Sequence, residues 1–446
     1  MFRTSSRSAR DKGTRDCSLV AADRQSSGVG QTFTTGLATR RNAMKSGVAA
    51  SLMTYAASVS AQVGGGRIRD YAPPRRLANV EHKVVYRKDN EFAGWPHVMG
   101  YWNIGDGEIL QQIRTATTTY PDADAIAHNK LGGQGAVTKM LSFRSKDYGR
   151  TWSGPQDNIF GKIDRTMAGA KDLGDLHLDY RDKNVLIANN ATAFAAPNSR
   201  TTVRVSKARG HSWSKPFEVP LDGLHSASGM NSVLIRPDGT ALIWLIEVID
   251  GFDRHPCVFA LPPRGLDFHF LSFVTPKVDV FRNTAGDWKP PLAYAGQHWF
   301  YPRGYLLPSG RMLCALRSQR GPEGVMWTEL YKSDDGGRTW SFFSRVNDFG
   351  APGSLVIKKD GRLVMVYGYR LMPSGIRARV STDEGATWGP ELIVRDDGGS
   401  WDLGYPNAWE MDDGRICTIY YFNNKDDAVH VNGGVRHVQR SIFSID

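Results

Sequence analysis

Short apolar runs separated by tight turns are repeated along most of the chain. Residues 311–317 and 362–370 are two such runs, each following a turn that contains glycine. Runs of this length with turn residues on both sides predict β-strands. The turns recur at intervals of about 60 residues, at Asp106-Gly107, Asp182-Lys183-Asn184, Asp238-Gly239, Ser309-Gly310, Asp360-Gly361 and Asp413-Gly414. Each interval accommodates four strands and their loops.

The repeat predicts an all-β fold. Six repeated four-stranded antiparallel sheets, arranged radially, form a six-bladed β-propeller, which protects the edges of its sheets by closing on itself. We place this domain at residues 80–446, after a linker at 62–79. Residues 249–299 match the repeat least and are interpreted as a degenerate blade with long loops.

A second repeat, out of phase with the first, has the pattern Ser-x-Asp-x-Gly-x-Thr-Trp. We call these segments the boxes; they occupy residues 145–152, 206–213, 333–340 and 381–388, and the second lacks the Asp and the Thr. In a hairpin turn the Asp caps backbone N–H groups, the Gly takes a positive φ, and the Thr and Trp resume the strand. The boxes are therefore predicted to stabilise the fold and not to catalyse.

Composition agrees with a strand-rich protein, because the chain has 47 glycines and 12 tryptophans. The net charge of +11 would suit nucleic acid, but residues 1–61 alone contain nine Lys or Arg and three Asp. The rest is mildly basic, without a nucleic-acid-binding motif, so we expect no nucleic-acid partner. Mean hydropathy of -0.39 argues against a protein built of membrane-spanning segments.

Residues 1–61 resemble an export leader. Arg40 and Arg41 precede a modestly apolar stretch, residues 47–60, that ends in the small-residue pattern Val59-Ser60-Ala61. This order is typical of a twin-arginine signal peptide, here following a polar, disordered extension. We therefore expect export to the periplasm or the exterior, and no membrane span.

Cysteine and metal-binding patterns are sparse. Cys257, Cys314 and Cys417 follow the leader without any CxxC pair, and the last two lie within apolar runs. Cys314 and Cys417 are predicted to be buried hydrophobic residues. The sequence contains no HExxH, no phosphate-binding glycine loop and no calcium loop, so we predict no cofactor and no metal.

The boxes resemble the Asp-box, or BNR, repeats of the sialidase superfamily, and the resemblance covers roughly residues 80–446. Within it, residues 367–370 (YGYR) and 402–406 (DLGYP) look most like bacterial sialidase-like proteins. The resemblance implies a six-bladed propeller with glycosidase activity. Sialidases use a tyrosine nucleophile paired with a glutamate, an aspartate acid, and three arginines that hold the substrate carboxylate.

Carried over to this sequence, the resemblance implies Tyr405 as the nucleophile, with Arg317 and Arg370 as two of the three arginines. The acid is Asp122 or Asp124, between which spacing does not decide. Two positions depart from the pattern: Trp95 stands where the first arginine is expected, and Tyr301, in the segment 300–303 that ends at Arg303, stands where the glutamate is expected.

A tyrosine with a usual pKa of about 10 needs a base to become a nucleophile. Without the glutamate, the candidates for that base are His97, His177 and Asp402. Two arginines still suffice to hold a carboxylate. The two arginines keep an acidic sugar as the expected substrate, while the two departures argue against sialic acid itself.

An aromatic–proline–polar triplet recurs in the sequence itself, at Trp95-Pro96-His97, Tyr301-Pro302-Arg303 and Tyr405-Pro406-Asn407. Arg114 likewise repeats the position of Arg317, seven residues after its turn. Equivalent positions in different blades face the same central opening. Together these residues form either a cup that binds a sugar or a structural ring that closes the centre.

Three functions remain open from the sequence. The first is hydrolysis of a terminal, acidic sugar from a glycan, by a monomer. The second is a polysaccharide lyase, in which Arg neutralises a uronate and His or Tyr removes the C5 proton. The third is a glycan-binding propeller without catalysis.

Overall fold

The computed structural model divides the chain into two units, Met1–Asp70 and Tyr71–Asp446. It describes residues of the second unit: 72–118, 120, 137–164, 166–167, 178–249, 254–263, 265, 267–276, 297–320, 325–427 and 434–446. The expected leader with Arg40 and Arg41 lies outside the described residues, as do Asp122, Asp124 and His177.

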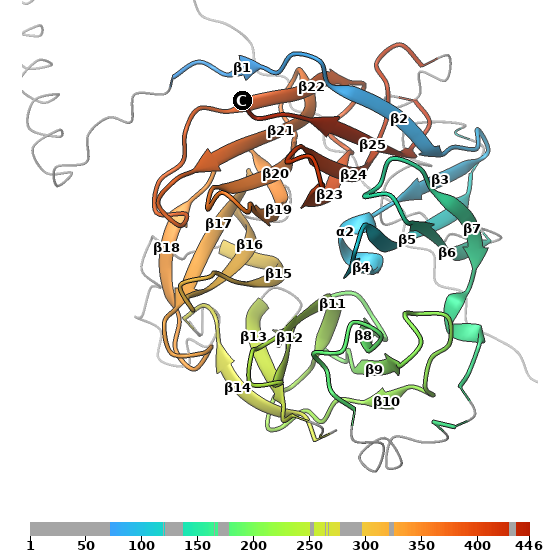
Figure 1. Ribbon diagram of the computed structural model, residues 1–446, viewed down its shortest axis with the longest axis vertical. Coiled ribbons are helices and arrows are strands. Elements are labelled where there is room, and N and C mark those ends of the chain that lie inside the picture. The colour runs from blue at the N-terminus through green and yellow to red at the C-terminus, as the bar shows by residue number, and fades with distance from the viewer. Residues whose placement is uncertain are drawn as a thin grey trace, which may run out of the picture. The chain divides into compact units, whose positions relative to one another are not determined.

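The described strands form five sheets that stand around a common centre (Figure 1). The first sheet contains β3 (Glu91–Gly94), β4 (Tyr101–Gly105), β5 (Glu108–Thr117), β6 (Thr138–Ser145) and β7 (Ser153–Asp157), followed by a 3-10 turn at Ile159–Gly161. A one-turn helix, α2 (Pro96–Met99), separates β3 from β4, and both strands pair with β5. The strand nearest the centre is thus interrupted in this sheet.

The second sheet has seven strands, in the order β10-β9-β8-β11-β12-β13-β14. Their bounds are β8 (Leu186–Ala191), β9 (Thr201–Ser206), β10 (Phe217–Glu218), β11 (Ser228–Ile235), β12 (Ala241–Val248), β13 (Arg254–Leu261) and β14 (His269–Phe273). Its two parts meet through one residue pair, Met230 with Asn190. The all-β prediction is confirmed, whereas the number of six blades stays a prediction.

Two further sheets follow in chain order. One contains β15 (Gln297–Leu306), β16 (Met312–Arg320), β17 (Met326–Ser333) and β18 (Ser341–Arg345). The other contains β19 (Gly350–Ile357), β20 (Leu363–Tyr369), β21 (Ser374–Ser381) and β22 (Leu392–Gly398), and β1 (Arg75–Arg76) pairs with β22 in parallel. The six predicted turns all precede or connect strands of these and the other sheets, as the repeat required.

The fifth sheet joins the two ends of the unit. It contains β23 (Gly404–Glu410), β24 (Ile416–Phe422) and β25 (His437–Phe443), and its outer strand is β2 (Glu81–Tyr86). β2 pairs antiparallel with β25, so that Glu81 faces Ile442. The beginning and the end of the described chain therefore complete one sheet.

Neighbouring sheets pack face to face through buried apolar side chains. Leu242 and Trp244 of β12 belong to one buried cluster with Cys314 and Leu316 of β16. The approach is close at Gly304, where an added Cβ would lie 1.9 Å from the Trp244 ring. The position therefore requires glycine.

The boxes form hairpin turns with the hydrogen bonds that the sequence predicts. In the third box, the Asp335 carboxylate accepts hydrogen bonds from the Thr339 backbone N–H at 2.9 Å and from the Ser333 hydroxyl at 2.7 Å, and the Gly337 N–H donates to the Ser333 oxygen. Burial raises the pKa of Asp335, but the hydrogen bonds from Thr339 and Ser333 outweigh it and lower the pKa to about 2. The carboxylate is therefore held in its charged form.

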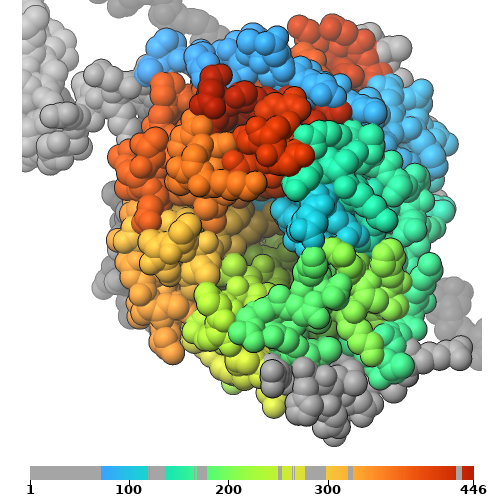
Figure 2. Space-filling model, viewed as in Figure 1, coloured from blue at the N-terminus to red at the C-terminus, as the bar shows by residue number. Residues whose placement is uncertain are grey.

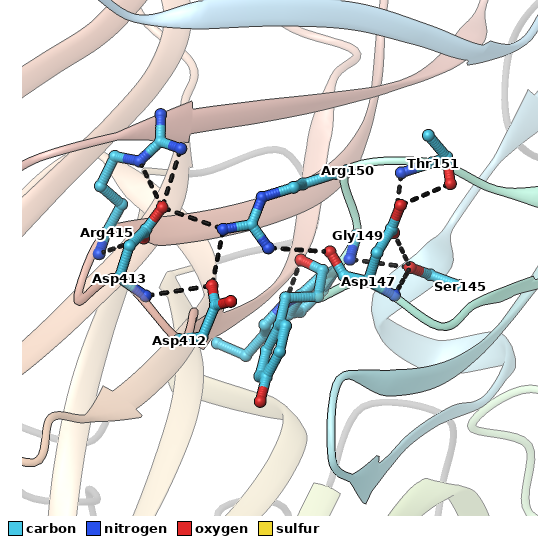
Figure 3. Close-up of polar contacts among 10 residues, drawn as sticks. Ser145, Asp147, Gly149, Arg150, Thr151, Asp412, Asp413 and Arg415 are labelled. Carbon is cyan, nitrogen blue, oxygen red and sulfur yellow. Dashed lines mark hydrogen bonds and ion pairs between the residues drawn. The ribbon is translucent and has the colours of Figure 1, made fainter.

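The first box also contacts a neighbouring sheet. Its Arg150 reaches Asp412 at 2.6 Å and Asp413 at 3.0 Å in the turn between β23 and β24 (Figure 3). A Cβ at Gly149 of this box would lie 2.6 Å from Trp409. The first sheet thus docks on the fifth through the first box.

Cys257, Cys314 and Cys417 are buried free thiols. Burial raises the pKa of Cys314 and Cys417, which agrees with the prediction that these two lie in the core. Within the described part of the chain, no helix is long and apolar enough to cross a membrane.

Candidate functional site

Three sheets place an aromatic–proline pair at the same position of the strand nearest the centre. The residue before each aromatic pairs with the next strand of its sheet: Gly94 with Arg114, Phe300 with Arg317, and Gly404 with Tyr421. The strand registers confirm that the triplets seen in the sequence occupy equivalent positions. They also confirm that Arg114 and Arg317 do.

The aromatic residue of each pair has a left-handed backbone: φ is 57° at Trp95, 54° at Tyr301 and 51° at Tyr405. This region is costly for a bulky residue, and a following proline restricts the backbone further. Strained conformations of this kind persist where the surrounding structure imposes them, and they are concentrated at functional sites. Here the strained backbone sets the direction of Tyr301 and Tyr405.

Tyr301 and Tyr405 meet through their hydroxyl groups, whose oxygens are 2.8 Å apart. Arg317 donates from Nη1 to the Tyr405 oxygen at 3.1 Å. Burial, and then the neighbouring Tyr405, raise the pKa of Tyr301 well above its usual value. Tyr301 therefore keeps its proton, and its hydroxyl can donate a hydrogen bond to the Tyr405 oxygen, which then accepts two hydrogen bonds.

Arg370 also lies beside Tyr405. Its guanidinium carbon is 5.5 Å from the centre of the Tyr405 ring and 5.6 Å from that of Trp401. Its Nε and Nη1 donate to the backbone carbonyls of Ala351 and Trp401. Among the described residues, Nη2 of Arg370 and Nε of Arg317 are buried and have no hydrogen-bond partner.

The sequence interpretation missed Arg254 and Phe300. The Arg254 guanidinium lies 4.5 Å above the Phe300 ring, and Arg317 lies over the same ring at 5.1 Å. Burial lowers the pKa of Arg254, and the charge of Arg317 lowers it further. Arg254 begins β13 in the stretch that matches the repeat least, so no pattern pointed to it.

Two exposed aromatic side chains flank the tyrosine pair. Phe194 is 59% exposed and its ring stacks on Phe300, while Trp401 is 49% exposed and lies beside Arg370. Exposed aromatic rings near a polar site are suited to stacking on sugar rings. Neither was predicted, because both lie outside the repeats.

Asp402 lies behind the tyrosines and contacts neither hydroxyl of the pair by a hydrogen bond. Its carboxylate accepts from the Tyr421 hydroxyl at 2.6 Å and from Nε of Arg436 at 3.1 Å, and both Asp402 and Arg436 are buried. The Tyr421 ring in turn packs against Tyr405. The sequence suggested Asp402 as a base for Tyr405. In the structure Asp402 instead holds Tyr421, whose ring packs against Tyr405.

His97 lies in α2, and Arg303 of β15 packs against it, so that both side chains fill the space at the centre of the sheets. Nδ1 of His97 is 2.8 Å from the Pro406 carbonyl oxygen, and Arg303 donates to the His97 carbonyl and to Asn407. Burial, together with Arg303, holds the pKa of His97 well below its usual value. For these two residues the geometry matches the structural ring that the sequence left open, and not the cup.

The remaining candidates are dispersed. Trp95 packs on Phe92 at the start of α2, with ring centres 4.7 Å apart. Arg114 is exposed on β5. Asp122, Asp124 and His177 lie outside the described residues, so the structure does not place the expected acid, Asp122 or Asp124. The structure thus brings together Tyr301, Tyr405, Arg317 and Arg370 from the predicted set.

Comparisons with solved structures support the fold. A protein of unknown function from Dyadobacter fermentans is 22% identical, with a TM-score of 0.59 over 83% of this chain and 100% of its own. A Trypanosoma rangeli sialidase in complex with the inhibitor DANA is 12% identical, with a TM-score of 0.50 over 82% of this chain. This chain spans 60% of that sialidase.

No protein-family model matches the chain, and no curated protein matches it in sequence. At the identities found, the likeness to solved structures is one of fold. The described part of the chain has a fold of the kind found in sialidases, with two tyrosines and three arginines gathered at its centre.

Proposed function

We propose that the protein is an exported glycan-processing enzyme that hydrolyses a terminal, acidic sugar, built on a six-bladed propeller in which the seven-stranded sheet supplies two blades. The observation that carries the proposal is a pair of buried guanidinium nitrogens that lack hydrogen-bond partners among the described residues. They are Nε of Arg317 and Nη2 of Arg370, and both arginines lie beside Tyr405. Buried donors without partners are costly, and a carboxylate would supply the missing acceptors.

Tyr405 would act as the nucleophile. Hydrogen bonds from Tyr301 and Arg317 stabilise negative charge as it develops on the Tyr405 oxygen. That oxygen forms a bond to the anomeric carbon while the glycosidic bond breaks, and Asp122 or Asp124 protonates the leaving oxygen. Water then hydrolyses the glycosyl–tyrosine intermediate. Of the bases named from the sequence, His177 remains to accept the Tyr405 proton, since His97 and Asp402 make other hydrogen bonds.

A lyase reaction is the second candidate, and one observation favours it: no carboxylate of the described residues is hydrogen-bonded to Tyr405, whereas an arginine is. Arg317 or Arg370 would neutralise the uronate carboxylate and Tyr405 would remove the C5 proton. The C4–O bond would break as the C4–C5 double bond forms, and the proton would pass to the leaving oxygen. The product would then be an unsaturated sugar that absorbs ultraviolet light. A glycan-binding protein without catalysis is the outcome if neither product forms.

The test is turnover on a panel of glycans with uronate, sialic acid or neutral ends, read by released sugar and by ultraviolet absorbance. The variant Tyr405→Phe keeps the ring and removes the attacking oxygen, so hydrolysis should fall at least about a thousandfold while binding persists. Tyr148→Phe, in the first box, is the matched control and should retain activity. An active Tyr405→Phe enzyme would exclude the tyrosine nucleophile.

The panel also tests the choice of sugar. Because Trp95 and Tyr301 replace an arginine and a glutamate of the sialidase pattern, we expect little turnover of simple sialosides. Efficient sialoside cleavage by the unmodified protein would contradict the assignment of these two positions.

A further inference from the structure

Arg303 is a buried cation with no counter-charge in the described part of the chain. The residue is 8% exposed, and its guanidinium donates to the Asn407 side-chain oxygen and to the His97 carbonyl oxygen, both of which are neutral. No carboxylate of the described residues forms an ion pair with it. A buried charge is costly unless an opposite charge lies nearby.

The nearest ionisable groups do not supply that charge. Burial raises the pKa of both Tyr101 and Tyr305, which face Arg303. Both phenols are therefore protonated at neutral pH. They can donate hydrogen bonds to an anion but cannot neutralise the guanidinium.

Arg303 lines open space on the side of α2 away from Tyr405. Two adjoining cavities, of about 610 and 400 Å³, share Tyr101, Asn103, Arg303 and Tyr305 in their walls. The larger is also lined by the turn at residues 181–183, so it lies at the end of the sheets where the hairpin turns are. Figure 2 shows the molecule hollowed near its centre, beside residues of α2 and β4 in cyan. We call this space the turn-side cavity.

Most cations in the walls of the turn-side cavity are paired with carboxylates. Arg181, Lys183 and Arg236 form ion pairs with Asp179, Asp106 and Asp238. Arg303, by contrast, is buried and has no carboxylate partner among the described residues. An anion that enters it would reach a buried cation that lacks an acidic partner in the described structure.

We propose that the turn-side cavity binds a small oxyanion, such as phosphate, sulfate or a small carboxylate, against the guanidinium of Arg303. Tyr101 and Tyr305 line the same space with hydroxyl donors, and Asn103 with an amide. Nη1 and Nη2 of Arg303 donate to Asn407 and to the His97 carbonyl, and each carries a second N–H that can donate to an oxygen of such an anion. The site is separate from the arginines around Tyr405 and does not depend on the proposed sugar chemistry.

The direct test is a crystal of the full chain grown with sodium selenate, whose selenium scatters anomalously. We expect an anomalous peak within hydrogen-bond distance of Arg303. Peaks at Arg303 and also beside Arg317 and Arg370 support the proposal equally, because the last two residues form the other site. Selenate found only at those two arginines, or at neither place, would overturn it.

Thermal unfolding separates the two sites in solution. In buffers of constant ionic strength, phosphate should raise the melting temperature of the wild type by about 2 °C when it is well above the dissociation constant. Arg317→Gln, the matched control, should keep most of this rise and Arg303→Gln should lose most of it. A rise that persists in Arg303→Gln and vanishes in Arg317→Gln would contradict the proposal. If Arg303→Gln does not fold, Tyr101→Phe is measured instead and should reduce the rise.

Discussion

At the scale of single residues, Arg317 has two roles that can be separated. It donates a hydrogen bond to Tyr405, and its buried Nε has no partner among the described residues. A charge-assisted contact of this kind contributes about 1.5–3 kcal/mol. Arg317→Ala should therefore reduce kcat/KM on an acidic glycan roughly tenfold to a hundredfold, and much less on a neutral glycan.

Arg317→Lys keeps the charge and loses the planar fork, so it should restore only part of the activity on the acidic glycan. Equal losses on acidic and neutral glycans would show that Arg317 acts through its hydrogen bond to Tyr405 or through the fold, and does not bind a carboxylate. The ratio of the two kcat/KM values is the measurement that decides.

Residues of the site differ in how far the sequence could reveal them. The sialidase resemblance pointed to Tyr405 and Arg317, and the repeat of positions between sheets pointed to Tyr301 as well as to these two; the strand registers confirm the repeat. Arg254, Phe194 and Trp401 come from segments without a repeat, and only the folded chain brings them to the site. For His97 and Arg303 the repeat was not sufficient. It placed both residues at the centre, but it could not decide between a sugar-binding cup and a structural ring.

At the scale of elements, the box hairpins allow a test of the turn cap. Asp335→Ala removes the acceptor of the Thr339 N–H, which should lower the free energy of unfolding by about 1–2 kcal/mol. Asp334→Ala, one residue earlier and paired with the half-buried cations Arg311 and Lys332, should change the melting temperature little. Turnover by the folded Asp335→Ala protein should be nearly unchanged.

The pH dependence of this effect has a definite sign. The pKa of Asp335 is lowered to about 2 in the folded protein. The contribution of its charge to the free energy of unfolding is therefore complete above the unfolded pKa of about 4, and it is lost as the pH falls toward 2. The difference in stability between the wild type and Asp335→Asn should therefore shrink over that range. A difference that stays constant between about pH 4 and 2 would show that the carboxylate charge does not matter.

Two glycines separate backbone strain from packing. Gly149 and Gly361 have nearly the same φ, 87° and 88°, but an added Cβ would lie 2.6 Å from Trp409 at Gly149 and would meet nothing within 4 Å at Gly361. Gly361→Ala should cost about 1–2 kcal/mol through strain alone. Gly149→Ala should cost a further 1–3 kcal/mol or so, because it also pushes the first sheet away from the fifth. Chemical denaturation of both variants gives the comparison, and equal losses would contradict it.

The box hairpins could be predicted from the sequence, because a turn is determined by residues that are close together in the chain. Each complete box needs its Ser, Asp and Gly within four residues, and these make the predicted hydrogen bonds. Helix α2 could not be predicted. Four residues have no helical periodicity of their own, and what holds this turn in place comes from distant strands, through Arg303 and Asn407.

At the scale of the whole molecule, the leader remains a prediction from the sequence. If residues 39–61 form a twin-arginine signal, replacing both Arg40 and Arg41 by Lys should leave the protein in the cytoplasm, since a receptor reads the two guanidinium groups. Cell fractionation with an antibody against the protein measures this. Replacing Arg3 and Arg7 in the same way is the control, and it should not affect export. Continued export of the Arg40 and Arg41 variant would exclude the twin-arginine signal.

The pairing of β2 with β25 governs the order in which the molecule can be completed. β2 is among the first described segments to leave the ribosome, and its partner β25 is the last described strand, so the fifth sheet stays open until β25 has been made. Contacts between such distant segments are slow to form. During that wait β25 is missing and β2 is an unpaired edge, which invites association with other chains. Its sequence, EHKVVY, begins with a glutamate, a histidine and a lysine, and these polar side chains discourage such association while the strand waits for its partner.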